Sequence, residues 1–563
     1  MPAFLQNAFT NALAGSGVGG SDTSITTFAS LAGLAAVVVL VVCTLIWHDR
    51  PIGVRPQPGM AKLTPAYPLV GNLPFFLSMA GSKTGMLDFM LEMQRTFGKG
   101  GKPFTVTAPI PAFGGRSIFI NRPEYIQYVQ KTNFPNFDKG KQFQNNFDDL
   151  LSRHGIFAAD GDIWKRQRKM ASNIFSVSNF RTHVQRTVQH HLETMQQLAA
   201  DCSKKQVEVN LPDLMFRFTL DTFAVMSFNA NLECLPTDSQ HLDKEVPFAT
   251  AFDFAQTVVN ERFVDPFWRI REFFGADGRR MRKSINSLRS ICFGMIDQRF
   301  AAKASGEQSG AVDSKEGKDL LQLFMDQGLS RDELLPVVLN FIIAGRDTTA
   351  QALSWAFLEL HRHPDIVRKI REEAKEVLAD GRLMEYDDLK AMPYTNAVFY
   401  ETLRLHPSVP KNIKVVRVDD VIRPYAQELD ASNDEKKELM QTERLPDIPV
   451  QKGTTVSWSD WAMGRMPEIW GEDCCEFKPD RFLKEDGSLK TYSQYKFHAF
   501  NAGPRLCLGQ TLATYEGVAM LVLLLSKYDI VLDDAKLKKD PPVYAESLTL
   551  PILNPYNARF RAL

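Results

Sequence analysis

The sequence predicts a mainly α-helical fold with a small β region, preceded by one N-terminal helix long enough to cross a membrane. Apolar residues recur at intervals of three and four from about residue 160 to 410, which is the spacing of one helix face. Short β-leaning pieces, at 104–107, 117–120, 414–418 and 454–458, indicate only a small amount of sheet. The composition is that of a globular protein, since 44% of the residues are hydrophobic and 23% are charged.

The first predicted element is an uncharged apolar run, Phe28–Trp47. A helix of this length, at about 1.5 Å per residue, would cross the roughly 30 Å hydrocarbon layer of a membrane. A cleaved signal peptide would have a shorter apolar region after a basic stretch, whereas only Asp22 is charged upstream. Arg50, Arg55 and Lys62 follow the run, so the rest of the chain is expected on the cytosolic side. The sequence predicts a retained single-pass anchor, with a buried core helix as the alternative.

The anchor divides the chain into four predicted parts. A short segment, 1–27, precedes the anchor at 28–47, and a connector rich in Pro and Gly occupies 48–74. Such spacing of prolines favours an extended and fairly stiff chain. The globular domain is predicted over 75–563, and its polar insertion at 423–443 is interpreted as a solvated surface.

Charge and cysteine content exclude several classes of protein. Lys and Arg number 66, as do Asp and Glu, so the formal net charge is zero and nothing indicates a nucleic-acid partner. The seven cysteines are scattered and odd in number, and they show neither a C-x-x-C pair nor zinc-site spacing. A disulfide framework is therefore not expected, and a reducing compartment is favoured.

The most informative motif is F-x-x-G-x-R-x-C-x-G, in the run FNAGPRLCLG near the C-terminal end. A thiolate at Cys507 that binds a haem iron needs hydrogen-bond donors and positive charge nearby. Gly503 and Gly509 allow a tight turn and aim amide N–H groups at the sulfur. Arg505 can reach an acidic edge group of the haem, and Phe500 can shield the sulfur. The alternative, a free cysteine in a turn, does not explain five fixed positions in ten residues.

A long helix is predicted from near Pro336 to His361, and it contains the run AGRDTT. Gly, Asp and Thr are poor choices for a buried helix interior. A Thr hydroxyl can bond the carbonyl one turn earlier and open the helix locally. We therefore predict that Thr348 holds a proton network for oxygen and that Asp347 relays protons from outside. An ordinary helix kink is the alternative.

Two further motifs combine charged residues at helical spacing. Glu401 and Arg404 form E-x-x-R on one helix face, and Arg481 in P-D-R-F supplies a second guanidinium. We interpret these three residues as a structural lock. Trp164 and Arg168 lie one helical turn apart, so both can bond a carboxylate. The alternative for that pair is the start of a basic amphipathic helix.

Taken in order, these motifs resemble those of the haem-thiolate monooxygenases, the cytochrome P-450 superfamily. The resemblance extends from the Pro-rich connector to the end of the sequence. Four longer stretches look like the fatty-acid ω-hydroxylases of plants and the alkane and fatty-acid hydroxylases of yeasts, at 155–172, 401–410, 457–482 and 495–510. The polar insertion departs from that pattern, as does Asp480, where Glu is more usual.

The resemblance implies the triangular-prism fold of that superfamily and haem b as the cofactor, with Cys507 as the axial ligand. Trp164, Arg168 and Arg505 would pair with the haem propionates. Electrons would come from NADPH through NADPH–cytochrome P-450 reductase, with cytochrome b5 as a further donor. One atom of O₂ would enter a C–H bond and the other would become water. The expected location is the endoplasmic reticulum membrane, with the catalytic domain facing the cytosol.

Hydroxylation at a chain end requires a pocket that lets only that end approach the iron. Candidate lining residues, each with an ordinary core role as the alternative, are Phe143, Leu150, Phe341, Ala344 and Val409. Lys411 and Lys414 are candidates for pairing a substrate carboxylate, although a solvated surface is the favoured interpretation for both.

Other functions stay open from the sequence. The same chemistry on a sterol, terpenoid or xenobiotic is the main alternative. A haem-thiolate isomerase of lipid hydroperoxides is disfavoured by Thr348 and the intact cysteine motif. A non-enzymatic haem carrier or gas sensor would leave Asp347 and Thr348 without a purpose.

Overall fold

The structure is a computed structural model, which we describe as two compact units. The described residues are 23–46, 60–63, 67, 70–74, 85–107, 116–175, 180–265, 267–305, 319–379, 381–424 and 445–563. One unit comprises residues 1–82 and 105–117, and the other comprises 83–104 and 118–563. Nearly all of the insertion predicted at 423–443 lies outside the described residues.

The smaller unit contains α2 (Thr23–Ile46) and β1 (Ala61–Lys62). In this unit the amide of Thr107 donates to Asn72 Oδ1 (2.7 Å). Judged by length and hydropathy together, no helix in the described ranges of the chain qualifies as a membrane span. The single-pass anchor over 28–47 stays a prediction.

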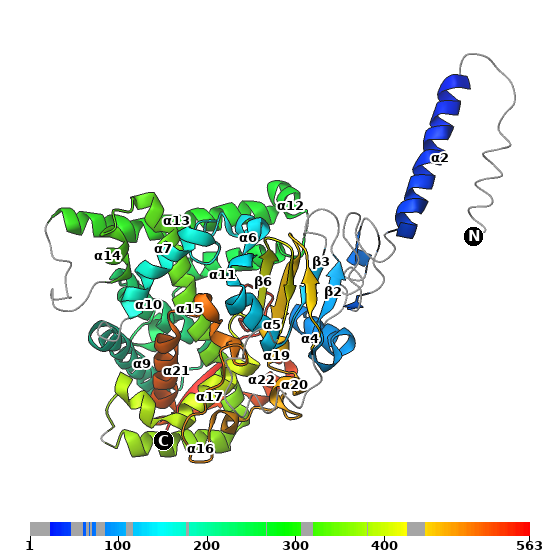
Figure 1. The fold of residues 1–563 in the computed structure, drawn as a ribbon. Helices are drawn as coiled ribbons and strands as arrows, with labels where there is room; N and C mark the ends of the chain where they lie inside the picture. The colour runs from blue at the N-terminus through cyan, green and yellow to red at the C-terminus, as the bar shows by residue number, and fades with distance from the viewer. Residues whose placement is uncertain are drawn as a thin grey trace. The chain divides into compact units, whose positions relative to one another are not determined.

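The larger unit is mostly helical, with β6 at one side of the helices in Figure 1. Its helices are α4 (Met86–Phe97), α5 (Pro123–Gln127), α6 (Gly140–Phe147), α7 (Gly161–Ala171), α9 (Gln185–Lys205), α10 (Leu211–Phe228), α11 (Pro247–Glu261), α12 (Trp268–Phe274), α13 (Ala276–Ala304), α14 (Leu320–Met325), α15 (Arg331–Arg362), α16 (Pro364–Val377), α17 (Pro393–Leu405), α19 (Asp460–Met463), α20 (Pro467–Trp470), α21 (Gln510–Leu525) and α22 (Asp534–Lys539). The mainly α prediction is confirmed.

The strands are short, as the sequence predicts. They are β2 (Phe104–Thr107), β3 (Arg116–Phe119), β4 (Phe137–Asp138), β5 (Val209–Asn210), β6 (Lys411–Val416), β7 (Asp420–Ile422), β8 (Ile448–Val450), β9 (Thr455–Ser459), β10 (Tyr528–Leu532) and β11 (Asn557–Ala562). Antiparallel pairs join β4 to β6, β6 to β9, β7 to β8, β10 to β11 and β11 to β5. The register of β6 on β9 sets Lys414 opposite Val456.

Helix α15 is the long helix predicted from the sequence, and it contacts α10, α13, α17 and α21. It begins at Arg331, five residues before the predicted start at Pro336. The reason is the capping box of Ser330 and Glu333, which satisfies the first backbone N–H groups ahead of the proline. Gly345 is required by packing, because a Cβ there would overlap Phe223 of α10.

The predicted lock is assembled at the end of α17. Arg404 forms a bidentate pair with Glu401, with Nε–Oε2 at 2.6 Å and Nη2–Oε1 at 2.7 Å. Arg481 lies 3.4 Å from Glu401 Oε1, and its Nη1 lies 2.7 Å from Asp473 Oδ1. Glu401 is fully buried, and desolvation raises the pKa of its carboxyl against the opposing effect of Arg404.

Arg404 also holds the chain beyond α20. Its Nη1 donates to the carbonyl of Cys474 (2.6 Å), and its Nη2 donates to that of Glu476 (3.0 Å). Glu401 Oε1 accepts from the amide of Lys478 (2.7 Å). One buried ion pair therefore ties a helix to three points of a loop.

We predict that Arg404→Met lowers the free energy of unfolding by about 3–5 kcal/mol, because it leaves the Glu401 carboxylate buried without its partner. The matched control is Arg368→Met, which removes an exposed pair with Glu372 (3.0 Å) and costs about 0.3–0.5 kcal/mol. Denaturant unfolding of the full chain measures both. Equal losses from the two substitutions would contradict the assigned role.

Candidate active site around Cys507

The cysteine lies in a tightly folded loop between the 3₁₀ turn Gly503–Arg505 and α21. Its amide donates to the carbonyl of Phe500 (2.8 Å). Gly503 has φ of +59°, and a Cβ there would overlap the backbone oxygen of Gln130, so glycine is required on both counts. Gly509 has an ordinary φ of −88°. Its backbone lowers the pKa of the Cys507 thiol.

The Cys507 side chain is exposed, yet desolvation by surrounding protein raises the pKa of its thiol. The Gly509 hydrogen bond and the charge of Arg168 act in the opposite direction. A sulfur with both properties faces a space enclosed by the protein rather than open solvent. This is the environment that a thiolate ligand of a bound group requires.

The predicted edge residues meet beside this loop. The Arg505 guanidinium carbon lies 4.2 Å from the centre of the Trp164 ring, and Arg168 Nη2 donates to the carbonyl of Leu506 (2.6 Å). Arg505 also pairs with Asp160 (3.0 Å). Desolvation lowers the pKa of Arg505 to about 10, so its positive charge is held in a poorly solvated place.

Lys139 and Lys414, which were not predicted to lie at this site, belong to the same cluster. Lys414 is 2% exposed, and its Nζ has no hydrogen-bond partner. Desolvation lowers its pKa far below the ordinary value, and the charges of Lys139 and Arg505 add to the effect. The solvated-surface interpretation of Lys414 is therefore wrong. The register of β6 turns this side chain inward, which no local pattern revealed.

A haem group fits this cluster. The cations Lys139, Lys414, Arg168 and Arg505 outnumber the nearby carboxylates of Asp138 and Asp160, and the Lys414 Nζ is buried without a hydrogen-bond partner. A buried cation is costly unless an anion pairs with it. Haem carries two propionates and an iron that binds thiolate, so it supplies the missing anions at one edge and the ligand for Cys507 at its centre.

The polar residues of α15 form a connection toward the surface. Asp347 is fully buried, and it accepts from Gln256 Nε2 (2.6 Å) and Arg346 Nη1 (2.7 Å). Arg346 Nη1 also donates to Asp253, whose side chain is 57% exposed (2.6 Å). Desolvation raises the pKa of Asp347 to about 6, with the charge of Arg346 opposing. Asp253, Gln256 and Arg346 were not predicted, although Arg346 adjoins the motif.

Thr348 bonds back along its helix as predicted. Its hydroxyl donates to the carbonyl of Ala344 (2.7 Å). The predicted local opening is wrong, because α15 runs unbroken from Arg331 to Arg362. The hydroxyl shares the carbonyl instead of displacing the helix bond. Across the described residues, no hydrogen bond or ion pair links Asp347 or Thr348 to the cysteine loop.

The predicted pocket residues have different environments. Phe143 stacks on Phe147 (4.5 Å), while Leu150 and Phe341 are buried and Val409 is 42% exposed. Ala344 is half-buried on α15.

Lys411 is half-buried, and its Nζ donates to Asn260 Oδ1 (2.7 Å). Desolvation lowers its pKa, so the solvated-surface interpretation is wrong for this lysine too.

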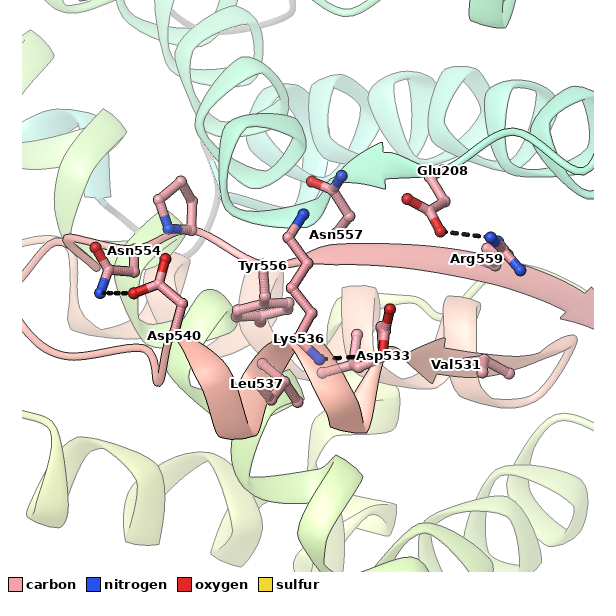
Figure 2. Close-up of a pocket in the computed structure, with 12 residues that line it drawn as sticks. Glu208, Val531, Asp533, Lys536, Leu537, Asp540, Asn554, Tyr556, Asn557 and Arg559 are labelled. Carbon is pink, nitrogen blue, oxygen red and sulfur yellow. Dashed lines mark hydrogen bonds and ion pairs between the residues drawn. The ribbon is translucent and has the colours of Figure 1, made fainter.

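A second hollow is unrelated to the candidate site. It has a volume of about 180 Å³ and lies among β10, β11 and α22, where Figure 2 shows the pairs Glu208–Arg559 and Asp540–Asn554. None of the predicted site residues lines it.

Comparison with known proteins shows the family of this chain. The sequence model of the cytochrome P450 family matches residues 62–426 and 432–556, and the break falls inside the predicted insertion. The chain is 37% identical over 527 residues to "Cytochrome P450 monooxygenase cyp1" of Mycosarcoma maydis, covering 90% of this chain and 76% of that protein. It is 31% identical over 482 residues to "Cytochrome P450 94B1" of Arabidopsis thaliana, covering 83% and 85%. It is 30% identical over 499 residues to "Cytochrome P450 94A1" of Vicia sativa, covering 86% of this chain and 87% of that protein.

The helical fold and the Cys507 site together define a haem-thiolate oxidoreductase. This chain belongs to the cytochrome P450 family. The family is one of monooxygenases that carry haem on a cysteine thiolate, take electrons from redox partners and act on hydrophobic substrates.

We predict that Cys507→Ser abolishes thiolate-ligated haem and all turnover. A serine oxygen cannot supply the soft thiolate, so the reduced, carbon monoxide-treated protein should lack the red-shifted Soret band. The control is Cys475→Ser, which replaces another exposed cysteine and should keep the band. A normal band in the Cys507→Ser protein would contradict the site.

Proposed function

We propose that this protein is a monooxygenase that inserts one atom of O₂ into a C–H bond at or near the end of a long-chain fatty acid or alkane. Its cofactor would be haem b, and its electrons would come from NADPH through NADPH–cytochrome P-450 reductase, with cytochrome b5 as a further donor. Support for the substrate class comes from the four stretches that resemble plant and yeast fatty-acid hydroxylases.

One structural observation carries the acid part of this proposal. Lys411 is desolvated, and its hydrogen bond goes to the neutral amide oxygen of Asn260. The carboxylate of Glu546 acts on it electrostatically, which opposes the lowering of its pKa. An ammonium with this exposure to apolar surroundings gains from a substrate carboxylate. An alkyl chain held at one end by that charge would reach the iron with its other end.

The residues of the chain have distinct duties in this reaction. Bound haem would supply O₂ activation and C–H oxidation. Cys507 would hold the iron, while Arg505 and Lys414 would hold the propionates. Thr348 would present its hydroxyl to the oxygen side, exchanging its bond to the Ala344 carbonyl for a donated hydrogen bond. Asp347 would hold the proton that this side needs.

We predict that Lys411→Met raises the KM for a long-chain fatty acid about tenfold or more, because a hydrogen bond to a charged group contributes about 1.5–3 kcal/mol. The KM for an alkane of the same length should not change. Lys452→Met, which removes an exposed lysine, is the matched control.

The assay combines the reductase, NADPH and a lipid panel with mass spectrometry of the products. Turnover of sterols or terpenoids alone would replace the fatty-acid proposal by its main alternative. A loss of alkane turnover equal to that of the acid would contradict the role of Lys411.

We also predict a pH dependence from Asp347. Its carboxyl is protonated below about pH 6 in the folded protein, so it can donate a proton there. Above that pH the carboxyl must first take up a proton, which would arrive by way of Arg346 and Asp253. Product formed per NADPH should fall as the pH rises through about 6. In Asp347→Asn the ratio should be low and independent of pH in this range.

The raised pKa of Asp347 also makes the free energy of unfolding depend on pH. Because the folded state binds the proton more tightly than the unfolded chain, the stabilisation is present at low pH and is lost as the pH rises to about 6. Denaturant unfolding of the wild type and of Asp347→Asn at several pH values measures this difference in stability.

A pH profile of product formed per NADPH that is the same in both proteins would contradict the role of Asp347 in holding the proton.

A further inference from the structure

Two adjacent cysteines, Cys474 and Cys475, lie in the loop between α20 and the 3₁₀ turn Pro479–Phe482. Both are free thiols, and their sulfurs are 3.9 Å apart. Cys474 is 3% exposed, whereas Cys475 is exposed to solvent. The pair therefore combines one sulfur that a small oxidant can reach with one that it cannot.

The exposed sulfur also has a cation beside it. Arg95 of α4 points Nη2 at Cys475 Sγ over 4.0 Å. A guanidinium in this position can stabilise the hydroxide that departs when the accessible sulfur attacks a peroxide. Cys474 is different, because desolvation raises its pKa to about 11 and keeps it a thiol. Cys475 is thus the group that reacts first, with Cys474 next to it to respond.

We propose that Cys474 and Cys475 form a reversible oxidation site, at which hydrogen peroxide converts the two thiols into a vicinal disulfide. This proposal does not depend on the substrate or on the cofactor. In the first step the Cys475 thiolate attacks one peroxide oxygen, the O–O bond breaks, and the departing hydroxide takes a proton to become water. Cys475 is then a sulfenic acid.

In the second step the sulfur of Cys474 attacks the sulfur of Cys475. The S–S bond forms, the S–O bond breaks, and the oxygen leaves as a second water with the Cys474 proton. The two sulfurs together lose two electrons, and the peroxide gains them. Two thiols and one peroxide therefore give one disulfide and two waters.

The geometry makes this disulfide easy to reduce. The sulfurs must close from 3.9 Å to about 2.05 Å. Neighbouring Cα atoms are about 3.8 Å apart, which is shorter than the usual span of about 4.4–6.8 Å across a disulfide. A strained bond of this kind has a high reduction potential, so a dithiol should reopen it.

Closing the ring also acts on the structural lock. The peptide group between the two cysteines carries the Cys474 carbonyl, which accepts from Arg404 Nη1 (2.6 Å). Turning that peptide to join the sulfurs moves this oxygen away from its donor. The same guanidinium pairs with Glu401, so the oxidised loop weakens a buried ion-pair site.

The test treats the full-length haem-loaded protein with stepwise equivalents of hydrogen peroxide. Free thiols are alkylated before and after reduction, and the peptides are mapped by mass spectrometry. We expect the first disulfide to appear within the peptide that contains Cys474 and Cys475, and to disappear with dithiothreitol. The midpoint of thermal unfolding should fall by a few degrees on oxidation and recover on reduction.

Three variants make the test specific. Cys475→Ser should prevent both the disulfide and the shift in midpoint. Cys474→Ser should leave Cys475 as a sulfenic acid that dimedone traps. This second variant keeps the proposal testable if Cys475→Ser disturbs the fold of the loop. Arg95→Met should slow the oxidation of Cys475 several-fold, while Arg368→Met should not.

Several outcomes would overturn the proposal. Oxidation of other cysteines while this pair stays reduced would do so, as would a disulfide between two chains. Irreversible oxidation of Cys475 with Cys474 unchanged would also contradict it. A disulfide that forms with no change in the unfolding midpoint would remove the coupling to Arg404.

Discussion

The structure depends on holding the sulfur of Cys507 where water cannot stabilise its charge. Desolvation raises the pKa of this thiol, so the protein itself must favour the thiolate, through the Gly509 backbone and the charge of Arg168. The loop can hold the sulfur there because Gly503 passes against the backbone of Gln130, where a side chain has no space. Sterics fix the path of the loop, and electrostatics then act on a sulfur already in place.

A consequence is that the cluster beside Cys507 favours the binding of an anionic group. Lys414 and Arg505 lie in desolvated surroundings, and the nearby acids Asp138 and Asp160 do not match the number of cations. The unfavourable energy of that arrangement is relieved when carboxylates of a bound group enter. A group that binds only the folded state stabilises that state by mass action.

The sequence predicted the class of fold, and it named Trp164, Arg168 and Arg505, which the structure places beside the Cys507 loop, because helices and motifs leave local signals. The helical period and the cysteine motif are each read within a few residues. Lys414 was misassigned because its burial is set by pairing with β9, far away in the chain. The glycine of the AGRDTT run was recognised only as a poor choice for a helix interior, whereas the reason for Gly345 is the side chain of Phe223 on another helix. Contacts between distant segments carry no local pattern.

The lock and the cysteine loop are joined by packed rings rather than by charge. Tyr400, one residue before Glu401, contacts Phe482 (5.8 Å) and Phe497 (5.4 Å), and these two contact each other at 5.0 Å. Phe497 in turn lies 6.2 Å from Phe500, whose carbonyl holds the amide of Cys507. Aromatic pairs contribute about 0.5–1.5 kcal/mol beyond their buried area. The Glu401–Arg404 ion pair fixes where α17 meets the loop that contains Cys474, and the packed rings connect this point to the loop that contains Cys507. A change at Arg404 is therefore expected to loosen the cysteine loop without touching it.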